Sequence, residues 1–179
     1  MPASGEKQHF IQGYNCQVVV DASSQVIVAA DVTPQTNDKQ QGLPMLQQVS
    51  ANIGQVPAQA SMDAGSFSAA TLDAVEALGI EVFMPPDRQP HGQPRPPAPR
   101  GRIPTTLGIT DRMRRKLRTR RGRAIYAKRK ATAEPVIGQI KGARGFRQFL
   151  LRGLAKVTAE WVLICTGHNL LKLWRTAEG

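Results

Sequence analysis

Two short β-branched runs open the pattern of hydrophobic positions. They occupy residues 14–21 and 26–32, and the small polar residues Ser23, Ser24 and Gln25 separate them. Two such runs joined by a small polar turn predict a β-hairpin.

The next elements alternate between helix and strand. Asn37 and Asp38 precede a stretch with helical apolar spacing, and Gly54 and Pro57 should end it. Ser68 is a suitable cap for the second helix. We expect strands over residues 58–62 and 80–84, and the helix capped by Ser68 over residues 69–78. This alternation predicts an α/β fold with a mixed sheet flanked by helices.

Composition changes sharply after residue 84. Eight prolines stand between residues 85 and 104, which excludes a helix or a central strand there and predicts an extended or disordered connector. The tail, residues 146–174, is apolar at helical spacing and should pack as core helices. We therefore divide the chain into strands and helices over 1–84, a proline-rich connector over 85–111, and a basic segment followed by helices over 112–174.

Charge adds an indication of the partner. Lys and Arg number 24 against 13 acids, a net charge of +11. From Arg112 to Lys130, 11 of 19 residues are basic and none is acidic. Solvated helix faces usually mix signs, whereas an acid-free run repels itself unless a polyanion neutralises it. We therefore expect DNA as the partner, with phosphate contacts from this run. The candidates include Arg114, Arg115, Arg118, Arg121 and Lys130.

A membrane surface is the other polyanion that this charge would suit. The sequence has no run of about 18 apolar residues, and its first residues are polar, without an apolar signal region. These features predict a cytoplasmic protein that does not enter a membrane.

Two carboxylates are candidates for chemistry. Asp63 ends a predicted strand, at the sheet edge where open α/β folds bind ligands. Glu134 is the only acid between Asp111 and Glu160, and we place it at or near a helix start with Pro135 in the first turn. Carboxylate oxygens suit Mg²⁺, and two such ions promote phosphodiester cleavage. Each acid also has an ordinary structural role as the alternative, and their spacing alone does not decide between the two.

Several motifs resemble one family, in that family's order. Residues 10–21 resemble the second-strand signature of bacterial insertion-sequence DDE transposases. Residues 28–32 with Asn37-Asp38 resemble its third strand and helix entry, and residues 62–68 its second-aspartate motif. Residues 126–141 resemble its Tyr…Arg…Glu…Lys signature. The remaining motifs follow in order at Gly145-Phe146-Arg147, residues 149–154, Glu160-Trp161 and His168-Asn169-Leu170.

The resemblance implies an RNase H-like fold and DNA transposition by Mg²⁺-dependent strand cleavage and joining. Asp63 matches the second catalytic aspartate and Glu134 the glutamate, so both would bind the metal. Tyr126, Arg129 and Lys141 match the signature residues that contact DNA near the cleavage site.

Two departures from the family follow. Ser66 stands where the family usually has tyrosine. The family's first aspartate lies on a strand upstream of the Tyr14 segment, and no Asp precedes Tyr14 here. We therefore expect a sheet incomplete at its first strand and a truncated, catalytically incomplete transposase.

Other interpretations stay open. A non-catalytic DNA-binding relic, or a regulator that competes with an intact transposase for DNA or for its multimer, fits the same motifs. A homo-oligomer or the intact transposase would then be the protein partner. A basic RNA-associated protein fits the charge alone. In the tail, His168, Trp161 and Trp174 predict core packing rather than ligand binding.

Overall fold

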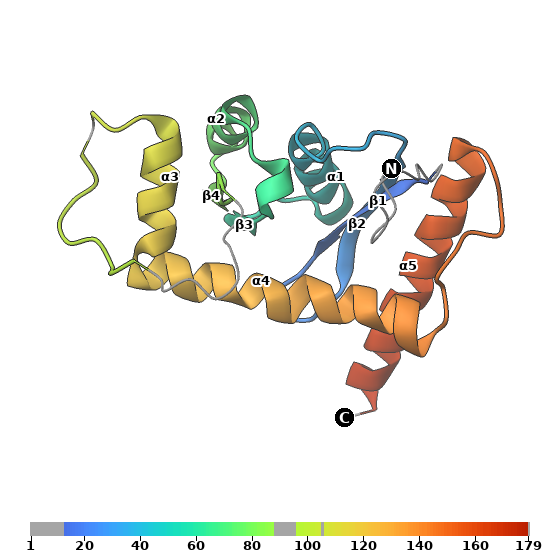
Figure 1. Ribbon diagram of the computed structural model, residues 1–179. Helices are drawn as coiled ribbons and strands as arrows, with labels where there is room; N and C mark the ends of the chain where they lie inside the picture. Colours follow the sequence, from blue (N-terminus) through green and yellow to red (C-terminus); the bar gives the residue numbers. More distant parts are fainter. Residues whose placement is uncertain (1–12, 88–95, 105, 179) are drawn as a thin grey trace.

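The computed structural model describes residues 13–87, 96–104 and 106–178 (Figure 1). The first residues of the strand motif, 10–12, and part of the proline-rich connector lie outside this description. The strands are β1 (Asn15–Val20), β2 (Ile27–Thr33), β3 (Gln59–Ser61) and β4 (Glu81–Phe83). The helices are α1 (Gly42–Ile53), the 3-10 turn η1 (Ala64–Ser66), α2 (Ala69–Ala77), α3 (Ile109–Arg118), α4 (Arg120–Gly138), the π turn η2 (Gln139–Ala143) and α5 (Leu154–Ala177).

The four strands form two small sheets. β1 and β2 pair antiparallel, with a register irregularity between Val19 and Val20, and β3 pairs parallel with β4. The α/β class and the hairpin are confirmed. Both strand orientations occur, but within the described residues they lie in two separate two-stranded sheets rather than in one mixed sheet.

Helices cover both faces of the β1–β2 sheet. On one face Ala29 packs with Met45 and Val49 of α1. On the other face, β1 and β2 share a core with the end of α4 and with α5, where Val136 and Val157 are fully buried. Each such side chain contributes about 1.5–3 kcal/mol through burial. The first and last segments of the chain therefore share one core.

A second core surrounds β3 and β4. Leu72 and Val75 of α2, Val82 of β4 and Met113 of α3 are buried together there. Helix α4 contacts β1, β3 and β4 and runs across beneath both sheets in Figure 1. This helix is therefore the element that links the two cores.

Two predicted helix boundaries are confirmed and one is wrong. The Ser68 hydroxyl accepts a hydrogen bond from Thr71 N at 3.0 Å, and Gly54 ends α1 in the left-handed conformation at φ 70°. However, α1 begins at Gly42 and not at Asn37-Asp38. The reason is that the Asp38 carboxylate bonds to the side chains of β1 and not to the first N–H groups of a helix.

The tail differs from the prediction of core helices over 146–174. Residues 144–153 form no regular helix, and α5 packs on β2 through one face only. Trp161 is buried and its indole N–H donates to Gln17 O at 3.1 Å, whereas Trp174 is 56% exposed, so the prediction of a packing role for Trp174 is wrong. The 24-residue α5 also carries exposed apolar side chains, among them Leu163, Leu170 and Leu173. Within the described ranges, no helix is both long and apolar enough to cross a membrane.

Candidate catalytic and DNA-binding site

Asp63 lies at the carboxyl end of β3, as its strand-terminal position predicted. It caps η1, because its Oδ1 atom accepts hydrogen bonds from Gly65 N at 3.0 Å and from Ser66 N and Ser66 Oγ at 3.3 Å each. Ser66, the departure from the family, thus helps to orient this carboxylate. The side chain is exposed, and its Oδ2 atom has no hydrogen-bond partner among the described residues.

A second carboxylate, Asp38, lies beside Asp63. Its Oδ1 atom accepts hydrogen bonds from Asn15 Nδ2 at 2.5 Å and Gln17 Nε2 at 2.8 Å, two side chains on β1. A Cβ atom placed on Gly65 would lie 3.2 Å from Asp63 Oδ1 and 3.4 Å from Asp38 Oδ2. Glycine at this position therefore lets the two carboxylates approach each other. Sequence reasoning did not select Asp38, although the residue stands in the Asn37-Asp38 motif.

Tyr126 and Arg129 of α4 share this neighbourhood. Burial raises the pKa of Tyr126, the Arg129 charge and hydrogen bond oppose the rise, and the charge of Asp63 adds to it. The Arg129 guanidinium carbon lies 5.5 Å from the centre of the Tyr126 ring. Arg129 Nε is buried without a hydrogen-bond partner in the described part of the chain. Tyr126 thus lies beside Arg129 and near enough to Asp63 to be affected by its charge.

The expected position of Glu134 at a helix start is wrong. Glu134 lies near the carboxyl end of α4, and Pro135 is inside the helix. The helical backbone continues through η2 to Ala143, so Glu134 lies more than one turn before its end, and the side chain is exposed to solvent.

A distant side chain lets the helix accept Pro135. Proline has no N–H, so the carbonyl four residues earlier loses its helical hydrogen bond. That carbonyl belongs to Ala131, and Gln25 Nε2 from the β1–β2 turn donates to it at 3.0 Å. The sequence favoured a helix start before Pro135 because this contact, from a residue far away in the chain, is not visible in a local pattern.

Asp63 and Glu134 have no common hydrogen-bond or ion-pair partner in the segments described. Glu134 follows Tyr126, the α4 residue near Asp63, by about 12 Å along the helix axis. No group of three or more Asp, Glu, His or Cys side chains able to hold a metal occurs within residues 13–87, 96–104 and 106–178. Their approach to one shared ion therefore stays a prediction.

Several cations of the basic run already pair with carboxylates. Arg114 bonds to Asp87 through Nε at 2.6 Å and to Asp111 through Nη1 at 2.7 Å. Arg121 Nη2 donates to Glu81 Oε2 at 2.6 Å, and Lys116 lies 3.8 Å from the same carboxylate. These contacts hold the pKa of Glu81 below its usual value, chiefly through the Arg121 hydrogen bonds.

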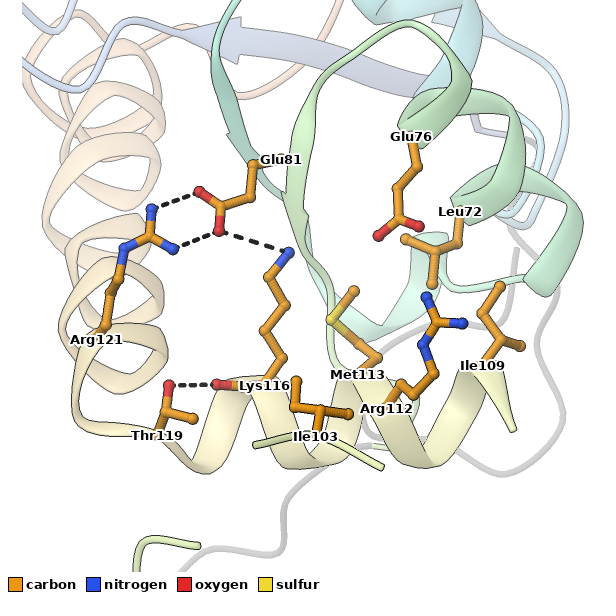
Figure 2. A pocket seen from close by; sticks show the side chains of 10 residues that line it. All are labelled: Leu72, Glu76, Glu81, Ile103, Ile109, Arg112, Met113, Lys116, Thr119 and Arg121. Carbon is orange, nitrogen blue, oxygen red and sulfur yellow. Dashed lines mark hydrogen bonds and ion pairs between the residues drawn. The ribbon is translucent and has the colours of Figure 1, made fainter. Parts of the chain in front are cut away.

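Figure 2 shows the ion pairs of Glu81 with Lys116 and Arg121 at the edge of an open cavity. The cavity has a volume of about 510 Å³ and lies between α2, β4, α3 and the start of α4. The cavity is also lined by apolar side chains, including Leu72 and Ile109. Glu81 is shared by Lys116 and Arg121, so it offsets one of their two positive charges.

The other predicted DNA contacts lie elsewhere. Arg115 and Arg118 donate to backbone carbonyls of residues 97–102 rather than to carboxylates. Lys130 and Lys141 are exposed, and Lys141 lies near enough to Cys16 for its charge to oppose the burial that raises the pKa of that thiol to about 11.

A family model described as the transposase DDE domain matches residues 102–174. The match contains α3, α4 and most of α5, and with them Tyr126, Arg129, Glu134 and Lys141; Asp63 lies outside it. This match supports the resemblance to a DDE-type transposase over residues 102–174. Neither a search of curated proteins nor a search of solved structures found a match.

Proposed function

We propose that this chain is part of the RNase H-like catalytic domain of an insertion-sequence DDE transposase. The observation that carries the proposal is that the charge of Asp63 reaches Tyr126. Tyr126 lies within the matched span, on the helix that also bears Arg129 and Glu134. In the complete protein this domain would cleave and join DNA strands with Mg²⁺.

The side chains divide into metal ligands and DNA contacts. Asp63 and Glu134 offer the carboxylate oxygens that Mg²⁺ prefers, and two ions would activate the attacking oxygen and stabilise the leaving oxygen. Two carboxylates are too few to organise such a centre, because Mg²⁺ keeps most of its waters without further ligands. We therefore propose that the chain by itself is catalytically incomplete.

The DNA contacts would come from Tyr126, Arg129, Lys130 and Lys141. The Arg129 guanidinium group offers N–H donors, and phosphate oxygens would accept from them. Tyr126 has a pKa raised above the ordinary tyrosine value, which already lies well above neutral pH, so its phenol keeps its proton and donates to the same kind of oxygen. These residues would hold the DNA backbone beside Asp63.

The second candidate function is a non-catalytic DNA-binding protein that regulates transposition. The observation that favours it is that the described segments assemble no three-acid metal cluster, while cations are abundant. Its protein partner would be a second copy or an intact transposase. β1 pairs only with β2 among the described strands, so its other edge is open to another chain's strand.

A cleavage assay on duplex DNA with Mg²⁺ or Mn²⁺ separates the two candidates. The present chain should bind the duplex without cutting it. A longer chain in which an aspartate-bearing strand is added before Tyr14 should cut. Asp63→Asn or Glu134→Gln in that longer chain should abolish cutting, whereas Asp73→Asn on the exposed face of α2 should not. Cleavage by the present chain that survives both site substitutions would contradict our assignment.

A further inference from the structure

Six of the cations of α3 and of the start of α4 fall into two groups. Arg114, Lys116 and Arg121 contact carboxylates, as described above. Three other arginines instead contact the segment 96–104, which we call the strap. They are Arg115, Arg118 and Arg123.

The contacts with the strap all run from guanidinium groups to backbone carbonyls. Arg123 Nη2 donates to Pro96 O at 2.5 Å, and Arg118 Nη2 donates to Pro97 O at 3.3 Å. Arg115 Nη2 donates to Arg100 O at 2.5 Å and reaches Gly101 O at 3.1 Å. Prolines offer a carbonyl acceptor but no N–H donor, so the proline-rich strap suits a row of donors.

A carbonyl partner orients a guanidinium group but leaves its charge uncompensated, whereas a carboxylate removes most of it. The three arginines and the strap's own Arg100 and Arg102 have no ion pair with another described residue. Each guanidinium carries five N–H donors. Nε and Nη1 of Arg115, Arg118 and Arg123 have no hydrogen-bond partner in the described segments, because the strap contacts use Nη2 alone.

We propose that the strap and these three arginines form a phosphate track for the backbone of duplex DNA, separate from the Asp63 and Glu134 site. Three oriented cations in a row fit a line of phosphates better than one small anion. The strap acts as a scaffold that fixes one side of each guanidinium and presents the other side to DNA. The choice of DNA as the polyanion rests on the proposed function.

Two triple variants with the same charge change test the track. One is R115Q/R118Q/R123Q, and the matched control is R114Q/K116Q/R121Q, so each removes three positive charges. Binding to a duplex of about 20 base pairs is measured by fluorescence anisotropy over a series of salt concentrations. Each phosphate contact contributes about 0.9 to the slope of log K against log salt. The first variant should therefore lower the slope by about 2–3 and the low-salt affinity by roughly 10-fold or more, and the control should change the slope by less than about 1.

Equal slopes in the two variants would overturn the track while leaving DNA binding intact. Absence of salt-dependent binding by the unmodified chain would instead contradict the proposed function. If a variant fails to fold, chemical modification of the arginines in the chain without substitutions tests the same proposal. Peptide mass spectrometry after phenylglyoxal treatment should show that DNA protects Arg115, Arg118 and Arg123 more than it protects Arg114 and Arg121. Equal protection of both groups, or tighter binding of an RNA duplex of the same sequence, would refute the assignment.

Discussion

Asp63 and Glu134 are held in place in two different ways. Asp63 depends on its neighbours in sequence, since Gly65 and Ser66 donate to it within one tight turn. Glu134 stands before a proline within a helix, and the helix depends there on Gln25, which is remote in sequence. One candidate site residue is therefore supported locally and the other by tertiary structure.

The support for Glu134 extends from Gln25 to α5. Gln25 has a positive φ of 59°, and its carbonyl oxygen lies 3.1 Å from His168 Nε2. Its side-chain oxygen accepts from Lys172 Nζ at 2.7 Å. Asn169 bonds to both the N–H and the carbonyl of Ile27, at 2.8 and 2.7 Å. Helix α5 thus holds the β1–β2 turn in place, and the same turn contacts α4 through Gln25.

The two kinds of support should respond differently to mutation. A change in the β1–β2 turn or in α5 should disturb the α4 segment around Glu134 and leave the Asp63 turn unchanged. A change in the Asp63 turn should remain local.

The largest effect should come from Asn169→Ala. It leaves the N–H and the carbonyl of Ile27 without their partner, and unsatisfied backbone groups cost about 1–3 kcal/mol each. We expect a loss of about 2–4 kcal/mol in the free energy of unfolding, measured by urea denaturation. Asn52→Ala is the control, because Asn52 makes one exposed bond to Val28 O of the same strand. An equal loss in both variants would show that the two hydrogen bonds of Asn169 to Ile27 stabilise the fold no more than the single bond of Asn52.

The next effect should come from Gln25→Ala, at about 1–2 kcal/mol, because Ala131 O loses its donor. In a Pro135→Ala background, residue 135 regains an N–H that bonds to Ala131 O. The Gln25 substitution should then cost less, and the difference measures the coupling. The loss of the Lys172 contact is common to both backgrounds and cancels. If Gln25→Ala costs the same free energy of unfolding in both backgrounds, the contact of Gln25 with Ala131 O does not compensate for Pro135.

Local patterns in the sequence predicted what local interactions determine. The hairpin, the Ser68 cap and the position of Asp63 after a strand depend on neighbouring residues, and each was predicted correctly. The predicted helix start at Glu134 failed because the partner of Ala131 O is a distant glutamine.

The sequence likewise did not show which group each charged side chain contacts. The basic run looked uniform, yet Arg114 contacts Asp87 and Arg115 contacts carbonyls, because each helix face meets a different neighbour. Asp38 was expected to open a helix, but β1 supplies its hydrogen-bond donors. The folded geometry determines such pairings, and a count of charges does not predict them.

A smaller effect should follow Asp63→Ala. Loss of a cap costs about 0.5–2 kcal/mol in a full helix, and η1 is a single short turn, so we expect a value near the lower limit. Asp63→Asn keeps an oxygen acceptor and should have almost no effect on stability. Thermal unfolding of both variants tests this expectation, and a loss above about 2 kcal/mol in the Ala variant would mean that Asp63 supports more than its own turn.

The smallest effect should be a pH dependence from His168. The side chain is fully buried, and its Nδ1 atom has no hydrogen-bond partner in the described part of the chain. Burial lowers the pKa of His168, and the charges of Arg144 and Lys172 lower it further, against the Gln25 carbonyl. The unfolded chain, with an ordinary histidine pKa near 6.5, therefore binds a proton more readily than the folded chain. Stability from this group is complete above about pH 6.5 and decreases as the pH falls through that value towards the lower folded pKa. Urea denaturation at several values between about pH 5 and 7.5 should show the decrease, and His168→Gln should reduce the slope. If the slope is unchanged in that variant, the pH dependence comes from other groups. Protonation of His168 would then have no effect on the β1–β2 turn.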